Sequence, residues 1–104
     1  MKIAIGIKKS GKPDLALIYC EKPATAAAVF TKNSVKAAPV LVCQKHIRSG
    51  QSQALVVNSG NANCFTGPFG MIYAQQTAEI FGKFLNIPGQ NVLVASTGII
   101  GRPL

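Results

Sequence analysis

The residues best suited to chemistry are Ser96, Thr97 and Gly98, which follow a short apolar run near the end of the chain. An apolar run bounded by turn residues is typical of a buried strand, so we expect a strand that runs into a sharp Ser-Thr-Gly turn. Gly98 admits backbone dihedral angles closed to other residues, which lets amide N–H groups converge on one point. With the Thr97 hydroxyl beside them, such donors suit an oxyanion hole. The competing interpretation is that Ser96 or Thr97 only caps a following helix.

A second polar stretch, Asn58 to Gly67, follows another apolar run and contains three asparagines. Asparagine tolerates left-handed backbone and bonds to neighbouring amides. The stretch either holds an anion at the start of the next helix or is a connection tied down by its own side chains. It matches neither the P-loop nor the dinucleotide-binding fingerprint, so the sequence does not support a nucleotide site.

The elements that must position these residues are predicted from apolar runs and turn residues. Strands are expected over residues 3–7, 15–20, 24–31, 40–43, 54–57 and 92–95. The first two strands should form a hairpin, because the glycine, proline and aspartate between them are turn residues. Residues 46–53 are expected to be a loop or a short helix.

One helix is predicted clearly, over Gly70–Leu85, where apolar side chains recur at three- and four-residue steps. Gly82 should weaken this helix by about 1 kcal/mol relative to alanine. Several strands and one helix, without a repeat or a linker, indicate a single domain of the α/β class over residues 1–104, built as a mixed layered sandwich. Because one helix covers one face of a sheet, the other face should lack a cover.

Composition narrows the possible partners. The chain is 48% apolar and only 13% charged, so it is too apolar for disorder, and part of its surface should be covered by something else. Its net charge of +8 raises nucleic acid as a partner. The cations are scattered, however, and aromatic stacking repeats are absent, so no nucleic-acid partner is expected. No apolar run is long enough for a membrane partner.

The cysteines and the single histidine do not form a recognisable site. Cys20, Cys43 and Cys64 are odd in number and far apart, which predicts neither a disulfide framework nor a zinc site. Reduced thiols and the absence of a signal peptide favour the cytoplasm. His46 lies in a polar stretch and is expected on the surface. We therefore expect no metal ion and no cofactor.

Four stretches of the chain match one family in order and at compatible spacing: Gly6–Ala16, Ala26–Val40, Val57–Asn63 and Ser96–Gly101. They resemble the N-terminal part of ornithine acetyltransferase, the bifunctional glutamate N-acetyltransferase of arginine biosynthesis. The resemblance covers nearly the whole chain and implies that family's layered α/β sandwich, incomplete here because family members are several-fold longer. The chain departs from the family's usual pattern after Asn63, where Cys64-Phe65 replaces Ala-Cys, and at Tyr73, where an acidic residue is usual.

The resemblance implies an acyl transfer shared between two parts of the protein. Family members cut themselves before a threonine, which takes acetyl from N-acetylornithine and passes it to glutamate; bifunctional members also use acetyl-CoA. Thr97 and Gly98 match the family's oxyanion-hole pair, whereas the nucleophile segment has no counterpart in this chain. The implied partners are the remainder of the acetyltransferase, its amino-acid substrates and further copies in an oligomer, and the chain alone should be inactive. The alternative is a catalytically dead fragment that serves as an assembly or dimerisation module.

Overall fold

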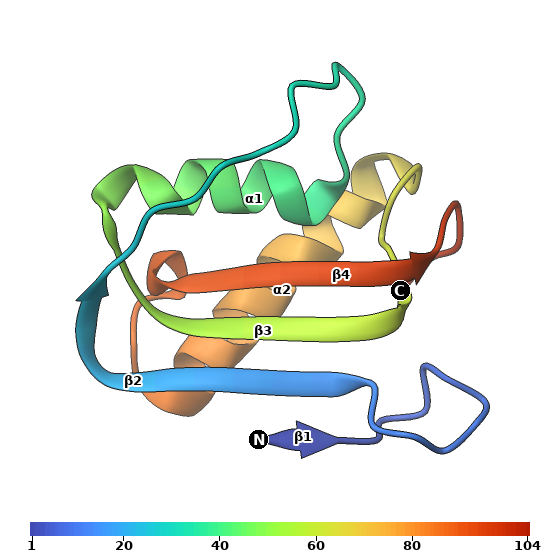
Figure 1. Ribbon diagram of the computed structural model, residues 1–104, viewed down its shortest axis with the longest axis horizontal. Coiled ribbons are helices and arrows are strands. Elements are labelled where there is room, and N and C mark those ends of the chain that lie inside the picture. Colours follow the sequence, from blue (N-terminus) through green and yellow to red (C-terminus); the bar gives the residue numbers. More distant parts are fainter.

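The computed structural model describes residues 1–104, which form one four-stranded sheet with two helices packed against it (Figure 1). The elements, in chain order, are β1 (Lys2–Ile3), β2 (Leu15–Thr25), α1 (Ala38–His46), β3 (Gln51–Asn61), α2 (Gly67–Leu85) and β4 (Val92–Ile99), with 3-10 turns at Ile47–Ser49 and Gly89–Asn91. The order of strands in the sheet is β1-β2-β3-β4. This arrangement confirms the predicted mixed α/β class.

The connection from β3 through α2 to β4 decides where the polar stretches meet. β1, β2 and β3 pair antiparallel, whereas β3 and β4 pair parallel. A parallel pair needs a crossover connection, and α2 supplies it by crossing behind the sheet (Figure 1). Parallel strands end at the same edge of a sheet, so the stretch that begins at Asn58 lies beside the stretch that begins at Ser96.

The hydrophobic core lies between the sheet and the two helices. The row Leu17, Val56 and Val94, in register across three strands, faces the helices. Alanines on α2 and α1 let the helices approach the sheet closely. The buried core residues are Ala38, Val42, Ala54, Val56, Ala74, Ala78, Val92 and Val94. None of the helices is long and apolar enough to cross a membrane.

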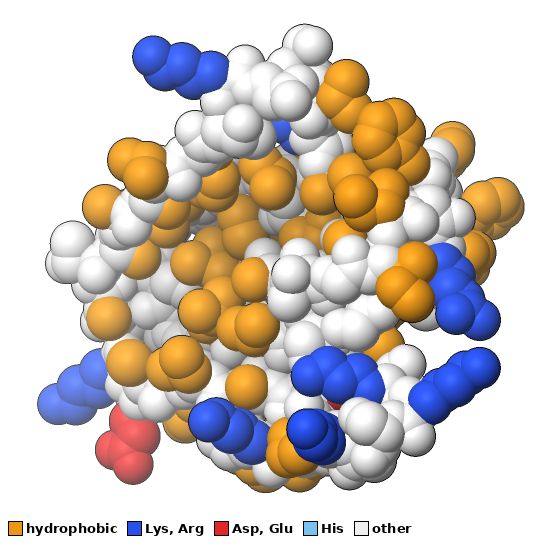
Figure 2. All heavy atoms as spheres, turned by 45° about the vertical axis from the view of Figure 1, so that its right-hand side comes forward, with side chains coloured by type: hydrophobic (Ala, Val, Ile, Leu, Met, Phe, Trp, Pro, Cys, Tyr) orange, Lys and Arg blue, Asp and Glu red, His pale blue; other side chains and the backbone are white.

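The opposite face of the sheet carries no helix. The next row of paired residues, which points to this face, is also apolar and consists of Ile18, Leu55 and Leu93. Ile18 is 59% exposed. Figure 2 shows apolar side chains gathered over a hollow on the molecule's surface. The prediction of one uncovered sheet face is therefore consistent with the register, although two helices, not one, cover the other face.

Three strand predictions are confirmed and one is wrong. The strands predicted at residues 15–20, 54–57 and 92–95 form parts of β2, β3 and β4, and α2 contains the predicted helix. The strand predicted at residues 40–43 is instead the middle of α1. Pro39 lies in the first turn of this helix, where its missing N–H costs nothing, and Ala38 and Val42 point into the core at helical spacing. A short apolar run fits a strand or a buried helix equally well.

Two other strand predictions are wrong in extent. Of residues 24–31, only Ala24 and Thr25 belong to a strand, because their partner β3 begins at Gln51. One further backbone bond, from Ala26 N to Gly50 O, lies beyond the strand. Of residues 3–7, only Ile3 belongs to β1. The backbone N–H of Ile5 instead donates to the Asp14 carboxylate. Residues 46–53 include the expected short helix, and their last three residues begin β3.

Two side chains of α1 close the free edge of β4. The Cys43 thiol donates to Val94 O at 3.0 Å and accepts from Val94 N at 3.3 Å. His46 Nδ1 donates to Val92 O at 2.8 Å, so this half-buried ring is not the surface residue that the sequence predicted. Burial raises the pKa of the Cys43 thiol, which keeps its proton available for donation. An edge strand with occupied backbone groups cannot add a further strand there.

Replacing Gly82 by alanine should destabilise the protein, although alanine is the better helix former. A Cβ at Gly82 would lie 2.9 Å from Ile87 O and 3.0 Å from the Cα of Gly89, where the chain folds back across the helix. Backbone atoms cannot rotate away, so we expect Gly82→Ala to lower the free energy of unfolding by about 1–3 kcal/mol in urea titrations. Gln76→Ala, on the exposed side of α2, is the control and should change it by less than about 0.5 kcal/mol. An unchanged or raised stability of Gly82→Ala would contradict this packing.

Candidate functional site

Thr97 and Gly98 lie at the carboxyl end of β4, and both are exposed. They belong to the strand itself, so the predicted sharp turn is wrong: the backbone continues through Gly98 with φ +132°. The register shifts at this point, where Asn61 pairs with both Thr97 and Ile99, which is the pattern of a bulge. Residues 100–104 contain no helix, so Ser96 and Thr97 have no helix to cap within these residues.

Gly98 is required by the close approach of β3. A Cβ at this position would lie 2.4 Å from the carbonyl carbon of Gly60 and 2.5 Å from the amide nitrogen of Asn61. A φ of +132° is also a conformation that is essentially confined to glycine. The strand ends therefore meet backbone to backbone, without side chains between them.

The three asparagines of the Asn58–Gly67 stretch are buried and bonded to the chain itself, with Asn58 and Asn61 among the last residues of β3 and Asn63 just after it. Asn58 accepts from the Ser96 hydroxyl and donates to Asn61 O, which joins the two strand ends. Asn63 donates to Gly70 O at 2.9 Å and thereby fixes the start of α2. No buried side-chain nitrogen or oxygen lacks a partner. These bonds favour the interpretation of this stretch as a connection tied down by its own side chains, over an anion site.

Asn61 also anchors the segment that follows β4. Its Nδ2 donates to Arg102 O and Pro103 O, both at 3.0 Å. Backbone bonds add to this anchor, from Ala62 N to Ile99 O and from Gly101 N to Cys64 O. The segment after Gly98 is thus held against the end of β3, and one wall of the site is formed.

Asp14 anchors the opposite wall, a role that the sequence did not predict. Its buried carboxylate accepts from the backbone N–H groups of Ile5 at 2.7 Å and Lys8 at 2.9 Å, and its carbonyl accepts from Ser59 N. These amides lower the pKa of Asp14 and hold its side chain ionised. The only available signal was an acid between a turn and an apolar strand in a chain with three acids.

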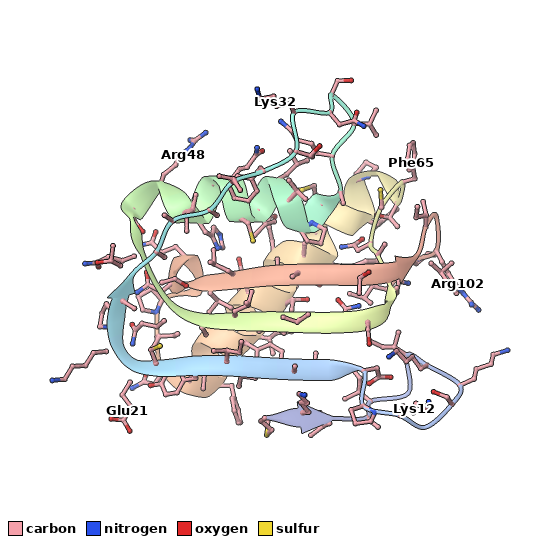
Figure 3. The ribbon with its side chains drawn as sticks, viewed as in Figure 1. Lys12, Glu21, Lys32, Arg48, Phe65 and Arg102 are labelled. Atoms are coloured by element: carbon pink, nitrogen blue, oxygen red, sulfur yellow. The ribbon has the colours of Figure 1, made fainter.

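Between these walls lies an open groove of about 980 Å³, with Gly60, Asn61 and Gly98 at its base. Lys8, Lys9 and Arg102 also line this groove. Figure 2 shows Lys and Arg side chains gathered at this end of the molecule, and Figure 3 shows Arg102 beyond the end of β4. Nowhere in the structure do three His, Cys, Asp or Glu side chains gather where they could hold a metal ion. The groove offers cationic side chains and the Gly98 backbone, whereas the neighbouring Thr97 does not line it.

Comparison with known sequences matches nearly the whole chain to one family. The ArgJ family model matches residues 1–104. The arginine biosynthesis bifunctional protein ArgJ of Syntrophotalea carbinolica is 54% identical over 99 residues, 95% of this chain and 25% of that protein. ArgJ 1 of Clostridium acetobutylicum is 55% identical over 102 residues, 98% of this chain and 25% of that protein. The chain thus spans about a quarter of the length of these curated relatives.

Two solved structures share the fold. The arginine biosynthesis bifunctional protein ArgJ from Bacillus halodurans superposes with a TM-score of 0.95 and 43% identity, over 100% of this chain and 55% of that chain. Ornithine acetyltransferase from Mycobacterium tuberculosis, complexed with ornithine, superposes with a TM-score of 0.93 and 45% identity, over 99% of this chain and 56% of that chain. The sheet and both helices described above are therefore shared with these enzymes.

Substituting Gly98 should disrupt the site far more than substituting a neighbouring glycine. In Gly98→Ala, the new Cβ meets the backbone of β3, and we expect the free energy of unfolding to fall by about 3 kcal/mol or more. Gly101 also has a positive φ, of 78°, but has open space around it, so Gly101→Ala should cost about 1 kcal/mol. Urea unfolding measures both, and equal losses would argue against the close backbone contact.

The loss of folding stability at acid pH should depend on Asp14. Its pKa is lowered in the folded protein, so the carboxylate stabilises the fold above its unfolded-state pKa of about 3.9, and this contribution is lost as the pH falls through the lower folded-state value. Urea unfolding at a series of pH values below about 5 should show a steeper decline for the wild type than for Asp14→Asn. Glu21→Gln, which removes an exposed carboxylate, should decline as the wild type does. Identical declines for wild type and Asp14→Asn would refute the anchoring role.

Proposed function

This chain belongs to the ArgJ family, and from that premise we propose that it is the N-terminal portion of an acetyltransferase of arginine biosynthesis that contributes the oxyanion hole. The reaction moves acetyl from N-acetylornithine, or from acetyl-CoA, to glutamate. The attacking threonine comes from the remainder of the protein. The observation that carries the proposal is the exposure of Thr97 and Gly98 at the end of β4, where Gly98 lines an open groove between the walls that Asp14 and Asn61 hold.

The position of Thr97 and Gly98 suits this role. Ligands of open α/β sheets bind outside the carboxyl ends of the strands, and both residues lie where β3 and β4 end together. Pre-organised donors are effective because they need no reorganisation when charge develops. The bonds around Asn61 and Asp14 pre-organise the two walls. A hydroxyl and an amide at this point can stabilise a carbonyl oxygen as it becomes negative.

The proposed chemistry has two acyl transfers. The threonine hydroxyl oxygen attacks the acetyl carbonyl carbon, and Thr97 and Gly98 stabilise the charge on the carbonyl oxygen. Collapse of this intermediate breaks the carbon–nitrogen bond, and the ornithine amine leaves with the proton taken from the hydroxyl. The glutamate amine then attacks the threonine ester, which regenerates the hydroxyl and forms N-acetylglutamate.

The uncovered face of the sheet supports the proposal that the remainder of the protein packs against this chain. The row Ile18, Leu55 and Leu93 has no helix over it. Leu55 and Leu93 line a mostly apolar pocket of about 310 Å³, whose other side is formed by α1 and by the segment before it. Burial of such a face is strongly favourable, at about 25 cal/mol per Å² of apolar surface. The chain spans only a quarter of its curated relatives, so sequence sufficient to cover this face exists in those proteins. The three free cysteines suit the reducing cytoplasm, where we place the enzyme.

The oxyanion role is tested in a hybrid enzyme in which residues 1–104 replace the matching stretch of the full-length Bacillus halodurans relative. Thr97→Val removes the hydroxyl but keeps the side-chain shape. We expect kcat for acetyl transfer from N-acetylornithine to glutamate to fall by about 10²–10³, the usual loss for one oxyanion-hole donor. The isolated 104-residue chain should show no turnover.

The control is the same substitution at the other end of the sheet. Thr25 is exposed at the end of β2, and Thr25→Val should leave kcat within about two-fold of the wild type, as expected for an exposed site away from the chemistry. Equal kcat values for the two variants would remove Thr97 from the catalytic machinery. Turnover by the isolated chain would show that the nucleophile is not supplied elsewhere.

A further inference from the structure

The cations in the groove beside Gly98 are placed by the fold, not merely scattered over the surface. Lys8 and Lys9 belong to the loop that Asp14 holds, and a Cβ on Gly60 would lie 3.0 Å from Lys8 Cγ, so the loop packs directly on the end of β3. Arg102 comes from the opposite wall, where its carbonyl accepts from Asn61. Three positive side chains therefore reach one groove from two anchored segments.

No Asp or Glu side chain lines this groove, so no acidic side chain of residues 1–104 neutralises the cations there. Asp14 is buried beneath the loop, and backbone amides occupy its two oxygens. Glu21 lies at the far end of β2 from the groove (Figure 3). Glu79 is on α2, outside the groove. Lys8 and Arg102 enter the hydrogen-bond network through backbone atoms, which leaves their charged groups available to a ligand.

We propose that Lys8, Lys9 and Arg102 form a subsite that binds the anionic group, carboxylate or phosphate, of the small molecule whose acetyl transfer takes place at Gly98. The inference rests on the proposed function and deepens it, because it says which side chains of this chain hold the substrate. Arginine and lysine bind carboxylate and phosphate oxygens through charge-assisted hydrogen bonds. The groove at about 980 Å³ is large enough for an amino acid or for part of a larger acyl donor.

The loop itself supplies a matched control. Lys12 is on the same loop and is exposed, but it does not line the groove. A general attraction of anions to a basic surface would depend on Lys12 as much as on the groove lysines. A subsite would depend on the groove cations alone. Glutamine is the replacement of choice because it removes the charge and keeps much of the side-chain stem.

The experiment compares the hybrid enzyme with its Lys8→Gln/Lys9→Gln, Arg102→Gln and Lys12→Gln variants. Isothermal titration gives dissociation constants for glutamate, N-acetylornithine and acetyl-CoA, and steady-state kinetics gives KM and kcat. We expect the groove variants to raise at least one dissociation constant and the corresponding KM by about ten-fold or more, as for loss of a charge-assisted hydrogen bond. Lys12→Gln should change them by less than about two-fold, as for an exposed charge. Weaker binding of the amino acids alone identifies carboxylate as the bound group, and weaker binding of acetyl-CoA alone identifies phosphate.

The possible failures are distinguishable. Turnover with dissociation constants that the groove variants leave unchanged would overturn the subsite and leave the proposed function intact. Equal weakening by Lys12→Gln would also overturn it, in favour of non-specific steering. Binding that depends on the groove cations in a hybrid without turnover would support the subsite and overturn the proposed function. Neither binding nor turnover in a folded hybrid would overturn both.

Discussion

The direct approach of two backbones at Gly60 and Gly98 is the constraint on which the site depends. Two parallel strands that end together can meet this closely only where neither carries a side chain between them, and a Cβ at Gly98 would fall within 2.5 Å of β3 atoms. The contact shifts the register and exposes the end of β4. Gly98 thereby lines the groove with backbone atoms alone, because a Cβ at this position would meet the backbone of Gly60 and Asn61.

Buried polar side chains hold the walls around this contact. Asp14 binds the loop on one side, and Asn61 binds the segment after β4 on the other. The side chains of Asp14 and Asn61 are buried, so an unmade bond would leave a polar group with little access to water without a partner. In the asparagine-rich stretch, the polar side chains are therefore used to hold neighbouring segments of the chain in place. Lys8 and Arg102, by contrast, take part in these bonds through backbone atoms alone.

Local patterns in the sequence predicted the helix and strands whose apolar residues recur regularly or form a bounded run. They did not predict the elements that depend on contacts distant in the chain. Helix α2 was recognisable from its repeated apolar face, and β3 and β4 from their bounded apolar runs. Helix α1 was missed because Val40–Val42 resembles a strand and becomes helical through packing on β4. Asp14 was recognised only as a turn residue, because its bond to Ser59, far away in the chain, leaves no local pattern.

The candidate site was predicted in residue type but not in geometry. Glycine beside threonine indicated an unusual backbone at residue 98, which the structure has, but as a bulged strand end and not as a turn. The bulge depends on the register with β3, which no local pattern encodes. The role of Thr97 and Gly98 as charge-stabilising donors rests on family membership and exposure, and it stays a proposal.

The most direct test of a site shared between this chain and the remainder of the protein is a crystal structure of the hybrid enzyme trapped with acetyl on its nucleophile. The account predicts that the acetyl carbonyl oxygen lies within about 3.1 Å of Thr97 Oγ1 and the Gly98 amide nitrogen, the distance at which such donors act. An acetyl carbonyl oxygen bound wholly by groups outside residues 1–104, with Thr97 and Gly98 turned away from it, would contradict the account.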